Sequence, residues 1–560
     1  MPAPKPLLTV IALLTLALPA FAADEWIHLS TPHVELYTTT GDKGAAEKRA
    51  REAIRTFEQV RTLVLDATHT NWDQVIPVRV ISFQSDKQFK PYAPDGAYSS
   101  NTLSRDYFIM IDSDPDHLPA AIHQYVDLAL LRSGLNLPTW LGEGLAELFS
   151  TLKPSANDAG TGAMVGGVLK DHLDELKSVK WLDFDTLTSV SEHSPSYNEK
   201  NRAGQFYAES WALVHMLCLG RDYHENFAKF IGYLSNAAVN GHKTAADAFQ
   251  TAYGRSMAQV YADLQAYVKQ NSLTATAFPI KGPAAQDPVT SPVSDSESGI
   301  MLADLMATMN KREQAKAAYD KLAKQYPGSA DIAESLGYLA MQSGDNETAR
   351  KYFEEALPGT KNPLMCYHLA MLYHDAGQRG DKLIAALTRA VALKPDYAEA
   401  RLQLGVLKYN QGDFAGAIAT LAPIERIAPE HAATLQSVLA SARESERPSM
   451  RRADGSTETV DSNPPPSVAI VDLPGGLKRV QGQADDLDCD GAHPRFSVLV
   501  GKNTMIFEIV DPKQITLRHE GPGRFEFVCG AMNRFQVKVD YQPDATPRPG
   551  IAGVMKAIEF

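Results

Sequence analysis

The sequence of 560 residues has only four cysteines, which excludes a fold built on disulfides but leaves room for one or two bridges. It has no excess of positive charge, because 54 Lys and Arg stand against 67 Asp and Glu and the formal net charge is −13. This balance argues against a general nucleic-acid coat or an anionic-membrane binder. Beyond the N-terminus, no stretch approaches the about 18 consecutive apolar residues of a membrane-spanning helix.

The sequence does have an ordinary globular composition. Hydrophobic residues make up 44% and charged residues 22% of the chain, so a globally disordered protein is excluded. At roughly 150 residues per domain, the length predicts three or four domains.

The first residues have the order of a secretory signal peptide. Lys5 precedes an apolar run over residues 7–18, which is followed by the small-residue triplet Ala20-Phe21-Ala22. We therefore expect residues 1–22 to be removed, the mature chain to begin at Ala23, and the protein to be exported to the periplasm or out of the cell. An uncleaved N-terminal anchor is the alternative. After cleavage, no transmembrane segment is expected.

Two stretches without apolar periodicity divide the mature chain. Residues 272–295 hold four prolines among small polar residues, and residues 445–467 are charged and then proline-rich. Such stretches cannot bury an apolar face and are typical of linkers. The chain is thus predicted to be multidomain, with parts at 23–271, 296–444 and 468–560.

The part at 296–444 is an internal repeat. Small and large apolar residues recur at intervals of 34 residues, and prolines close three of the units. The recurring positions are Ala315/Ala349/Leu383/Ala417, Tyr319/Phe353/Leu387/Leu421 and Pro327/Pro395/Pro429, with close-approach glycines at 337 and 405 and turn glycines at 344, 377 and 412. The pattern resembles the tetratricopeptide repeat in four units, which implies an α-helical solenoid that ends in a closing helix at 432–444.

A solenoid of this kind has a concave surface that usually binds a peptide or a helix of another protein. We therefore expect the repeats to bind a protein or peptide partner, and no nucleic acid. The alternative is that the repeats only pack against the N-terminal domain.

The part at 468–560 changes from helical to strand periodicity, which predicts a small antiparallel β-sandwich or barrel. The alternating segments are 496–500, 515–517, 525–527 and 535–541. Cys489 and Cys529 both lie in this part, and in an oxidising compartment we expect them to form a disulfide. Cys218 and Cys366 lie on apolar helical faces and are expected to be buried thiols.

The part at 23–271 begins with strands and a helix and then becomes mainly helical, which predicts an α+β domain. Strands are expected at 33–37, 78–83 and 107–112, and an amphipathic helix at Ala50, Ala53, Ile54, Phe57 and Val60. His123 and Asp127 lie four residues apart on one later helix, and Glu143 and Glu147 four apart on the next, so each pair shares a helix face. Two facing helices with these side chains are able to hold one divalent metal ion.

This layout resembles the gluzincin zinc peptidases, and specifically the peptidase MA-like domains of exported bacterial proteins. The segment Trp140-Leu141-Gly142-Glu143-Gly144-Leu145-Ala146-Glu147 matches the second motif of that family, and residues 207–213 are similar to its later helix. The strand at 107–112 corresponds to the family's edge strand, where an extended peptide binds by strand addition. The resemblance implies that His123 is the first and Glu143 the third ligand of a zinc ion.

The first motif departs from the family's His-Glu-x-x-His at two positions. Gln124 stands where the family has its catalytic glutamate, and a neutral amide cannot take a proton from the attacking water. Loss of such a base commonly costs about 10²–10⁴ in rate. Asp127 stands where the second histidine ligand is expected, and an anionic ligand makes a metal ion less electrophilic and favours harder ions.

Two hypotheses follow. In the first, which we expect, the N-terminal domain is a pseudoenzyme without catalytic residues or a cofactor, the protein is a binding or scaffold module, and His123 is a buried histidine satisfied by hydrogen bonds. In the second, the domain is a divergent zinc-dependent hydrolase with His123, Asp127 and Glu143 as ligands and a base elsewhere. Binding of zinc or another divalent ion without catalysis lies between the two. Glu147 is expected to be a solvated or capping carboxylate, and Trp140 a core residue.

Overall fold

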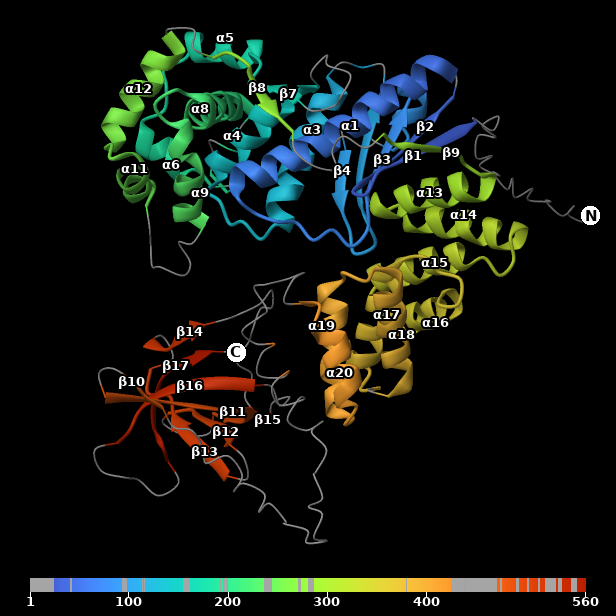
Figure 1. Ribbon diagram of the computed structural model, residues 1–560, viewed down its shortest axis with the longest axis vertical. Helices are drawn as coiled ribbons and strands as arrows, with labels where there is room; N and C mark the ends of the chain where they lie inside the picture. Colours follow the sequence, from blue (N-terminus) through green and yellow to red (C-terminus); the bar gives the residue numbers. More distant parts are fainter. Residues whose placement is uncertain are drawn as a thin grey trace, which may run out of the picture. The chain divides into compact units, whose positions relative to one another are not determined.

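The computed structural model divides the chain into two compact units, residues 1–447 and 448–560 (Figure 1). The described residues run from 25 to 424 except 41–42, 93–97, 113, 115, 155–161, 192, 195–196, 198–199, 236–243, 270–272, 281–286 and 379, include Leu435 and Leu439, and run from 471 to 559 except 474–475, 490–492, 501–502, 512–513, 519–529, 532–535 and 545–550. The expected signal peptide at 1–22 and linker at 445–467 lie outside them. The first unit holds both the N-terminal domain and the repeats.

The N-terminal domain is built around a six-stranded sheet with the order β4-β5-β3-β2-β1-β9. Its strands are β1 (Trp26–Ser30), β2 (Val34–Thr39), β3 (Val78–Phe83), β4 (Tyr98–Asn101), β5 (Asp106–Ile111) and β9 (Val289–Pro292). The central strands β2, β3 and β5 are parallel, and the outer strands pair antiparallel with their neighbours. The three strands predicted from the sequence are these central ones.

Both faces of this sheet are buried, because its side chains alternate between two apolar clusters. Leu36, Val78, Val80, Phe108 and Met110 face one cluster, and Tyr37, Ile81, Phe83, Tyr107, Ile109 and Ile111 face the other. The first cluster is shared with α1 (Lys43–Thr68) and α3 (His117–Arg132), and the predicted apolar face of α1 is buried in it. The second face is covered by Met301 and Leu305 of α13 (Asp295–Thr308), the first helix of the repeats.

The segment 272–295 is not the unpaired linker that its composition predicted. β9 extends the large sheet at β1, and β8 (Thr276–Pro279) pairs with β7 (Gly162–Val165), which also pairs with β6 (Lys153–Pro154). Both β8 and β9 are edge strands, which tolerate a proline at their last position, and backbone pairing needs no apolar face. This segment therefore ties the repeats to the N-terminal domain.

The N-terminal domain has further helices among the described residues. They are α2 (Asp86–Phe89), α4 (Thr139–Ser150), α5 (Lys170–Ser178), α6 (Phe184–Ser189), α8 (Lys200–Leu219), α9 (Phe227–Ser235), α11 (Ala245–Tyr253) and α12 (Met257–Lys269). Gly144 lets α4 pack tightly on α8, because a Cβ there would lie 2.4 Å from Val214 Cγ2 and 2.5 Å from the Ser210 carbonyl oxygen. This contact fixes the position of Glu143 and Glu147 on α4.

In the described part of the repeats, four helix pairs follow one another at the predicted period. They are α13 with α14 (Arg312–Gln325), α15 (Ala330–Gln342) with α16 (Asn346–Ala356), α17 (Pro363–Asp375) with α18 (Asp381–Leu393), and α19 (Ala398–Asn410) with α20 (Phe414–Leu421). The turn glycines are left-handed, with φ of 76° at Gly344, 71° at Gly377 and 82° at Gly412. Of the expected closing helix at 432–444, the described residues Leu435 and Leu439 are buried against Leu421 and Ile424.

The C-terminal unit is a β-barrel in which β11, β12, β13, β17 and β16 form a closed ring. Its strands are β10 (Val471–Leu473), β11 (Leu477–Asp488), β12 (Arg495–Val500), β13 (Asn503–Glu508), β14 (Thr516–Arg518), β15 (Gly530–Ala531), β16 (Gln536–Gln542) and β17 (Gly553–Glu559). The ring is not purely antiparallel as predicted, because β13 and β17 are parallel. A closed ring with an odd number of strands requires at least one parallel pair. Small Greek-key barrels of this architecture include the OB-folds.

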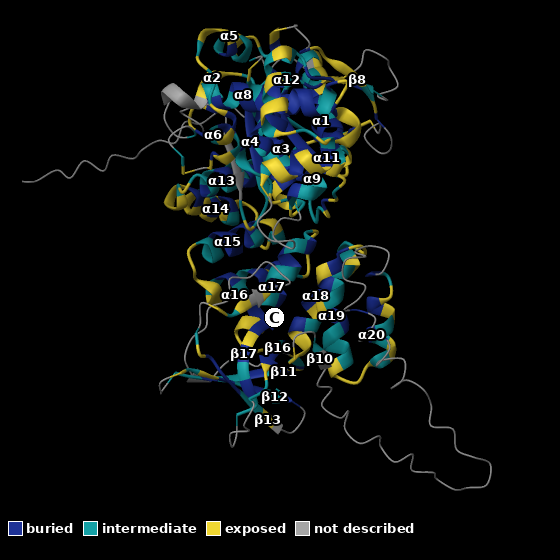
Figure 2. Cartoon of the chain, turned by 90° about the vertical axis from the view of Figure 1, so that its left-hand side faces the viewer, coloured by how far each residue is buried: buried dark blue, intermediate teal, exposed yellow. Residues whose placement is uncertain are grey.

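The cysteines divide as the sequence indicated, as far as the structure describes them. Cys489 is in a disulfide, whereas Cys218 and Cys366 are free thiols; Cys366 is buried as expected, but Cys218 is only partly buried. Cys529 lies outside the described residues, so its pairing with Cys489 stays a prediction. Buried residues line the inner faces of the helices and the sheets (Figure 2). Within the described part of the chain, no helix is both long and apolar enough to cross a membrane.

Candidate functional site

The candidate site lies where α3 faces α4. His123 and Asp127 share one face of α3, and Glu143 enters from the second turn of α4, which begins after Pro138. Trp140 and the leucines of α4 are fully buried in the core beneath it, so α4 is anchored by its apolar side. Trp140 is therefore part of the core, as predicted.

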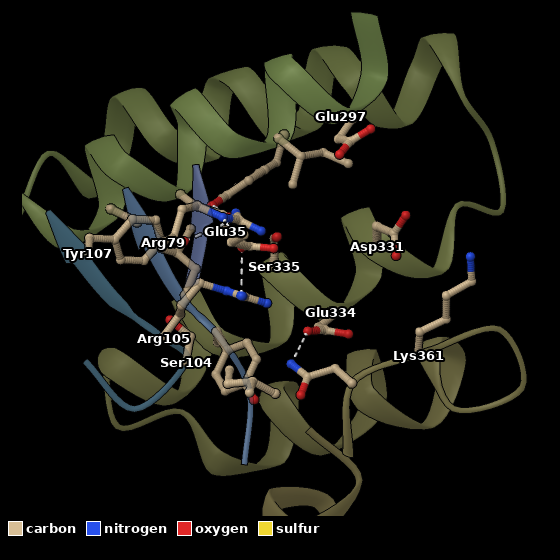
Figure 3. Close-up of a pocket in the computed structure, with 18 of the residues that line it drawn as sticks. Glu35, Arg79, Ser104, Arg105, Tyr107, Glu297, Asp331, Glu334, Ser335 and Lys361 are labelled. Carbon is tan, nitrogen blue, oxygen red and sulfur yellow. Dashed lines mark hydrogen bonds and ion pairs between the residues drawn. The ribbon is translucent and has the colours of Figure 1, made fainter. Parts of the chain in front are cut away.

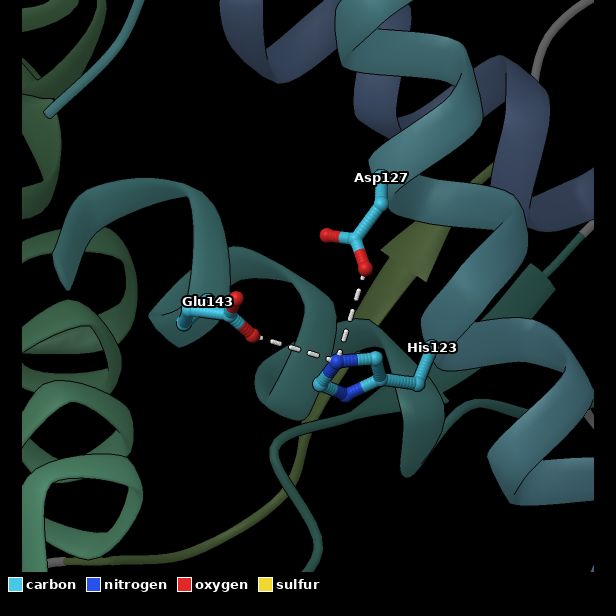
Figure 4. Close-up of side chains that lie close together, drawn as sticks. All are labelled: His123, Asp127 and Glu143. Atoms are coloured by element: carbon cyan, nitrogen blue, oxygen red, sulfur yellow. Dashed lines mark ion pairs between the residues drawn. The ribbon is translucent and has the colours of Figure 1, made fainter. Parts of the chain in front are cut away.

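The structure brings the three expected metal ligands together (Figure 4). His123 Nε2 lies 3.5 Å from Asp127 Oδ2 and 3.3 Å from Glu143 Oε2. One donor atom from each residue lies within 4.8 Å of the other two. An imidazole and two carboxylates in this arrangement are a donor set for a divalent cation.

Glu147 is not the solvated carboxylate that the sequence suggested. Its Oε1 lies 3.5 Å from His123 Nδ1, and its Oε2 lies 3.2 Å from Nε2 of His172 on α5. Glu147 thus faces the ring nitrogen of His123 that points away from Asp127 and Glu143. Carboxylates in this position orient metal-binding histidines by fixing their tautomer. Sequence reasoning missed His172, because α5 carries no motif that would set this histidine apart.

Tyrosines close the opposite side of the site. The Tyr197 hydroxyl donates a hydrogen bond of 2.8 Å to Glu143 Oε1, and the ring of Tyr207 on α8 lies 6.4 Å from that of His123. The segment 207–213, which resembled the family's later helix, therefore does lie beside the expected ligands. Burial and the neighbouring Glu143 raise the pKa of Tyr207 to about 12, so this hydroxyl stays protonated.

The acidic groups leave the site short of positive charge. Burial lowers the pKa of His123, but the contacts with Glu143, Asp127 and Glu147 outweigh this effect and raise that pKa to about 9. Burial raises the pKa of Asp127 to about 7, against the opposing influence of His123. Apart from its ion pair with His123, the buried Glu143 Oε2 has no hydrogen-bond partner among the described residues. A protonated imidazole therefore supplies the charge that a metal ion would supply.

Gln124 and strand β5 were both singled out in the sequence, and the structure shows the surroundings of each. The side-chain oxygen of Gln124 is buried and has no hydrogen-bond partner in the part of the chain that the structure describes. β5, expected to be an edge strand, pairs with β3 on one side and β4 on the other. The prediction that a peptide binds to β5 by strand addition is therefore wrong, because the backbone groups of β5 are already paired with β3 and β4.

Family models match three segments of the chain. Residues 300–363 and 384–442 match tetratricopeptide repeats, and residues 119–239 match a family described as a protein of unknown function (DUF1570). The predicted tetratricopeptide repeats are thus confirmed. The family that matches the segment with the three candidate metal ligands has no known activity. The gluzincin resemblance stays a prediction. No curated protein matches the chain.

Several solved structures are similar to about a quarter of the chain. YrrB, described as a tetratricopeptide-repeat protein with an unusual peptide-binding site, is 27% identical over 27% of this chain and 80% of its own, with a TM-score of 0.24. MamA is 22% identical over 27% of this chain and 81% of its own, with a TM-score of 0.22. MamA from Desulfovibrio magneticus RS-1 is 20% identical over 26% and 77%, with a TM-score of 0.19.

Proposed function

We propose that the protein is an exported, protein-binding scaffold whose N-terminal domain is a pseudopeptidase that holds a divalent metal ion without hydrolysing peptides. The observation that carries the proposal is Gln124. It follows His123 on α3, at the position of the catalytic glutamate in the family that this domain resembles. An amide has no basic site for the proton of an attacking water, so the general base of a peptidase is missing.

The donor set of His123, Asp127 and Glu143 fits a metal ion. Three carboxylates, counting Glu147, surround one imidazole, and the buried Glu143 oxygen without a hydrogen bond lies within the donor cluster. Two carboxylate ligands favour harder divalent ions more than the two histidines of the family do. A bound ion would act there as a Lewis acid, and it would hold α3 and α4 together.

The repeats support the binding role. Tetratricopeptide repeats typically bind protein or peptide partners, and four helix pairs of this type follow the N-terminal domain. The disulfide at Cys489 suits an oxidising compartment, which supports export.

The second candidate function is a divergent metal-dependent hydrolase. The convergence of His123, Asp127 and Glu143 beside Tyr197 and Tyr207 favours it, because these groups could bind a metal ion and hydrogen-bond a substrate. It needs a base other than Gln124.

Metal content tests the proposal. The mature protein, purified without chelator, is compared with His123→Ala and with His374→Ala, which removes an exposed histidine of the repeats. We expect about one transition-metal ion per chain in wild type and His374→Ala, and none in His123→Ala. A wild-type protein without metal after incubation with excess zinc would overturn the metal-binding part.

Hydrolysis and partner capture test the remaining parts. We expect metal-loaded wild type to cleave no member of a broad peptide library. Cleavage that Glu143→Ala abolishes would instead establish the hydrolase. A pull-down in which deletion of 296–444 leaves the captured proteins unchanged would count against the repeats as the binding surface.

A further inference from the structure

A second polar site lies far from α4 along the chain, between the large sheet and the first two repeats. It is a cavity of about 470 Å³, within the size range of ligand sites (Figure 3). Its ionisable lining residues are Glu35, Arg79, Arg105, Glu297, Asp304, Asp331, Glu334 and Lys361, together with the tyrosines 37, 107, 319 and 338. The walls therefore come from both the N-terminal domain and the repeats.

The two arginines on the sheet side of the cavity are matched by two carboxylates, Glu35 of β2 and Asp304 of α13. Arg105 Nη1 donates to Glu35 Oε1 at 2.6 Å, and Arg79 donates to the same oxygen. Arg79 also lies 3.6 Å from Asp304 and contacts the rings of Tyr37 and Tyr107, at 5.1 and 5.7 Å. Two guanidinium groups thus match two carboxylates, and the balance explains how so many charges are buried.

The repeat side is not balanced. Glu297 on α13 and Asp331 and Glu334 on α15 all line the cavity, with Lys361 as the cation on that side. In the whole lining, five carboxylates stand against three cationic groups. Glu334 is fixed in place, because Asn362 Nδ2 and the Thr360 hydroxyl donate to it at 2.6 and 2.9 Å.

We propose that this cavity binds a lysine or arginine side chain of an extended peptide segment of a partner protein. The unbalanced carboxylates of the repeat side attract a cation, and the fixed Glu334 provides an oriented acceptor for its N–H groups. The charged and hydroxyl-rich walls disfavour an apolar ligand, because such a ligand would leave these groups without partners.

This inference rests on the proposed protein-binding role and adds the chemistry of the partner. It does not involve His123 or the other candidate metal ligands. If the full chain captures partners through the repeats but variants of the cavity capture them equally well, this inference fails while the proposed function stands.

The test measures binding of the blocked hexapeptide Ac-Ala-Ala-Lys-Lys-Ala-Ala-NH₂ to the full-length mature chain by isothermal titration at low salt. The control peptide has norleucine in place of both lysines. The test variant is Asp331→Asn with Glu334→Gln, which removes two charges but keeps polar side chains. The matched control is Glu313→Gln with Glu347→Gln, which removes two carboxylates of the same repeats that do not line the cavity.

We expect the lysine peptide to bind wild type and the matched control equally, and the test variant about ten-fold more weakly. The norleucine peptide should show no binding. Equal affinity of the test variant and wild type, or no binding of the lysine peptide at millimolar concentration, would overturn the proposal. Free cadaverine distinguishes a small amine from a peptide, because a peptide site should bind the hexapeptide at least about ten-fold more tightly. Equal affinities would exclude the peptide.

Discussion

Two clusters of charged side chains in the N-terminal unit differ in how their charges are balanced. At the sheet, Glu35 pairs with two arginines, and the pKa of its carboxyl is lowered although burial would raise it. At the candidate site, three carboxylates face His123 and the described residues provide no arginine or lysine. A cluster whose charges are matched needs no added ion, and its role is to stabilise the fold. A cluster with an excess of carboxylates attracts a cation.

The largest effect should come from restoring the missing base at the unbalanced cluster. Gln124→Glu combined with Asp127→His recreates the family's first motif, and Asp127→His alone is the matched control that lacks the base. With zinc bound to both, we expect peptide hydrolysis by the double variant to be about 10²–10⁴-fold faster. Equal rates of the two variants on a peptide library would show that the cleft lacks more than its general base. The excess of carboxylates around His123 would then not be explained by the loss of a catalytic glutamate.

The balanced cluster should respond through stability instead. Arg79→Met leaves Glu35 and Asp304 buried with less compensation, and breaking a buried pair in this way costs about 3–5 kcal/mol. Urea unfolding of the mature chain measures this loss, and Lys351→Met, at an exposed ion pair, should change stability by less than about 1 kcal/mol. A small loss for Arg79→Met would mean that water enters the cavity freely enough to solvate both carboxylates.

The two clusters also differ in how far the sequence predicts them. His123, Asp127 and Glu143 could be brought together from sequence, because i,i+4 spacing sets a helix face and the second motif identifies α4. Glu35, Arg79 and Asp304 come from β2, β3 and α13, and no local pattern relates them. The same holds for His172 and for β9, whose pairing depends on backbone groups rather than on side-chain periodicity.

Glu209 gives a third case, a buried carboxylate that no cation contacts within the described residues. It accepts hydrogen bonds from Leu182 N and Gln205, and burial raises its pKa to about 7. The folded protein therefore binds this proton more tightly than the unfolded chain, and stability falls as the pH rises from about 4.5 to about 7. Between those limits Glu209 should cost on the order of 3 kcal/mol.

Urea unfolding at pH 5 and pH 7.5 measures this cost. We expect Glu209→Gln to lose less stability than wild type between these two pH values, and Glu225→Gln, at an exposed position, to follow wild type. An unchanged pH dependence in Glu209→Gln would indicate that hydrogen bonds alone stabilise the ionised carboxylate as well as water does.

The smallest effect should come from the groups behind the candidate ligands. Glu147→Gln weakens the contact that orients His123, and we expect the dissociation constant for zinc to rise about 10–100-fold while one site per chain is retained. His172→Ala acts through Glu147, so adding it to Glu147→Gln should weaken zinc binding no further. The control is Asp174→Asn, which changes an exposed residue of α5, the helix that carries His172. Additive losses would mean that His172 contacts the ion itself, and the unbalanced cluster would then extend to a fourth ligand.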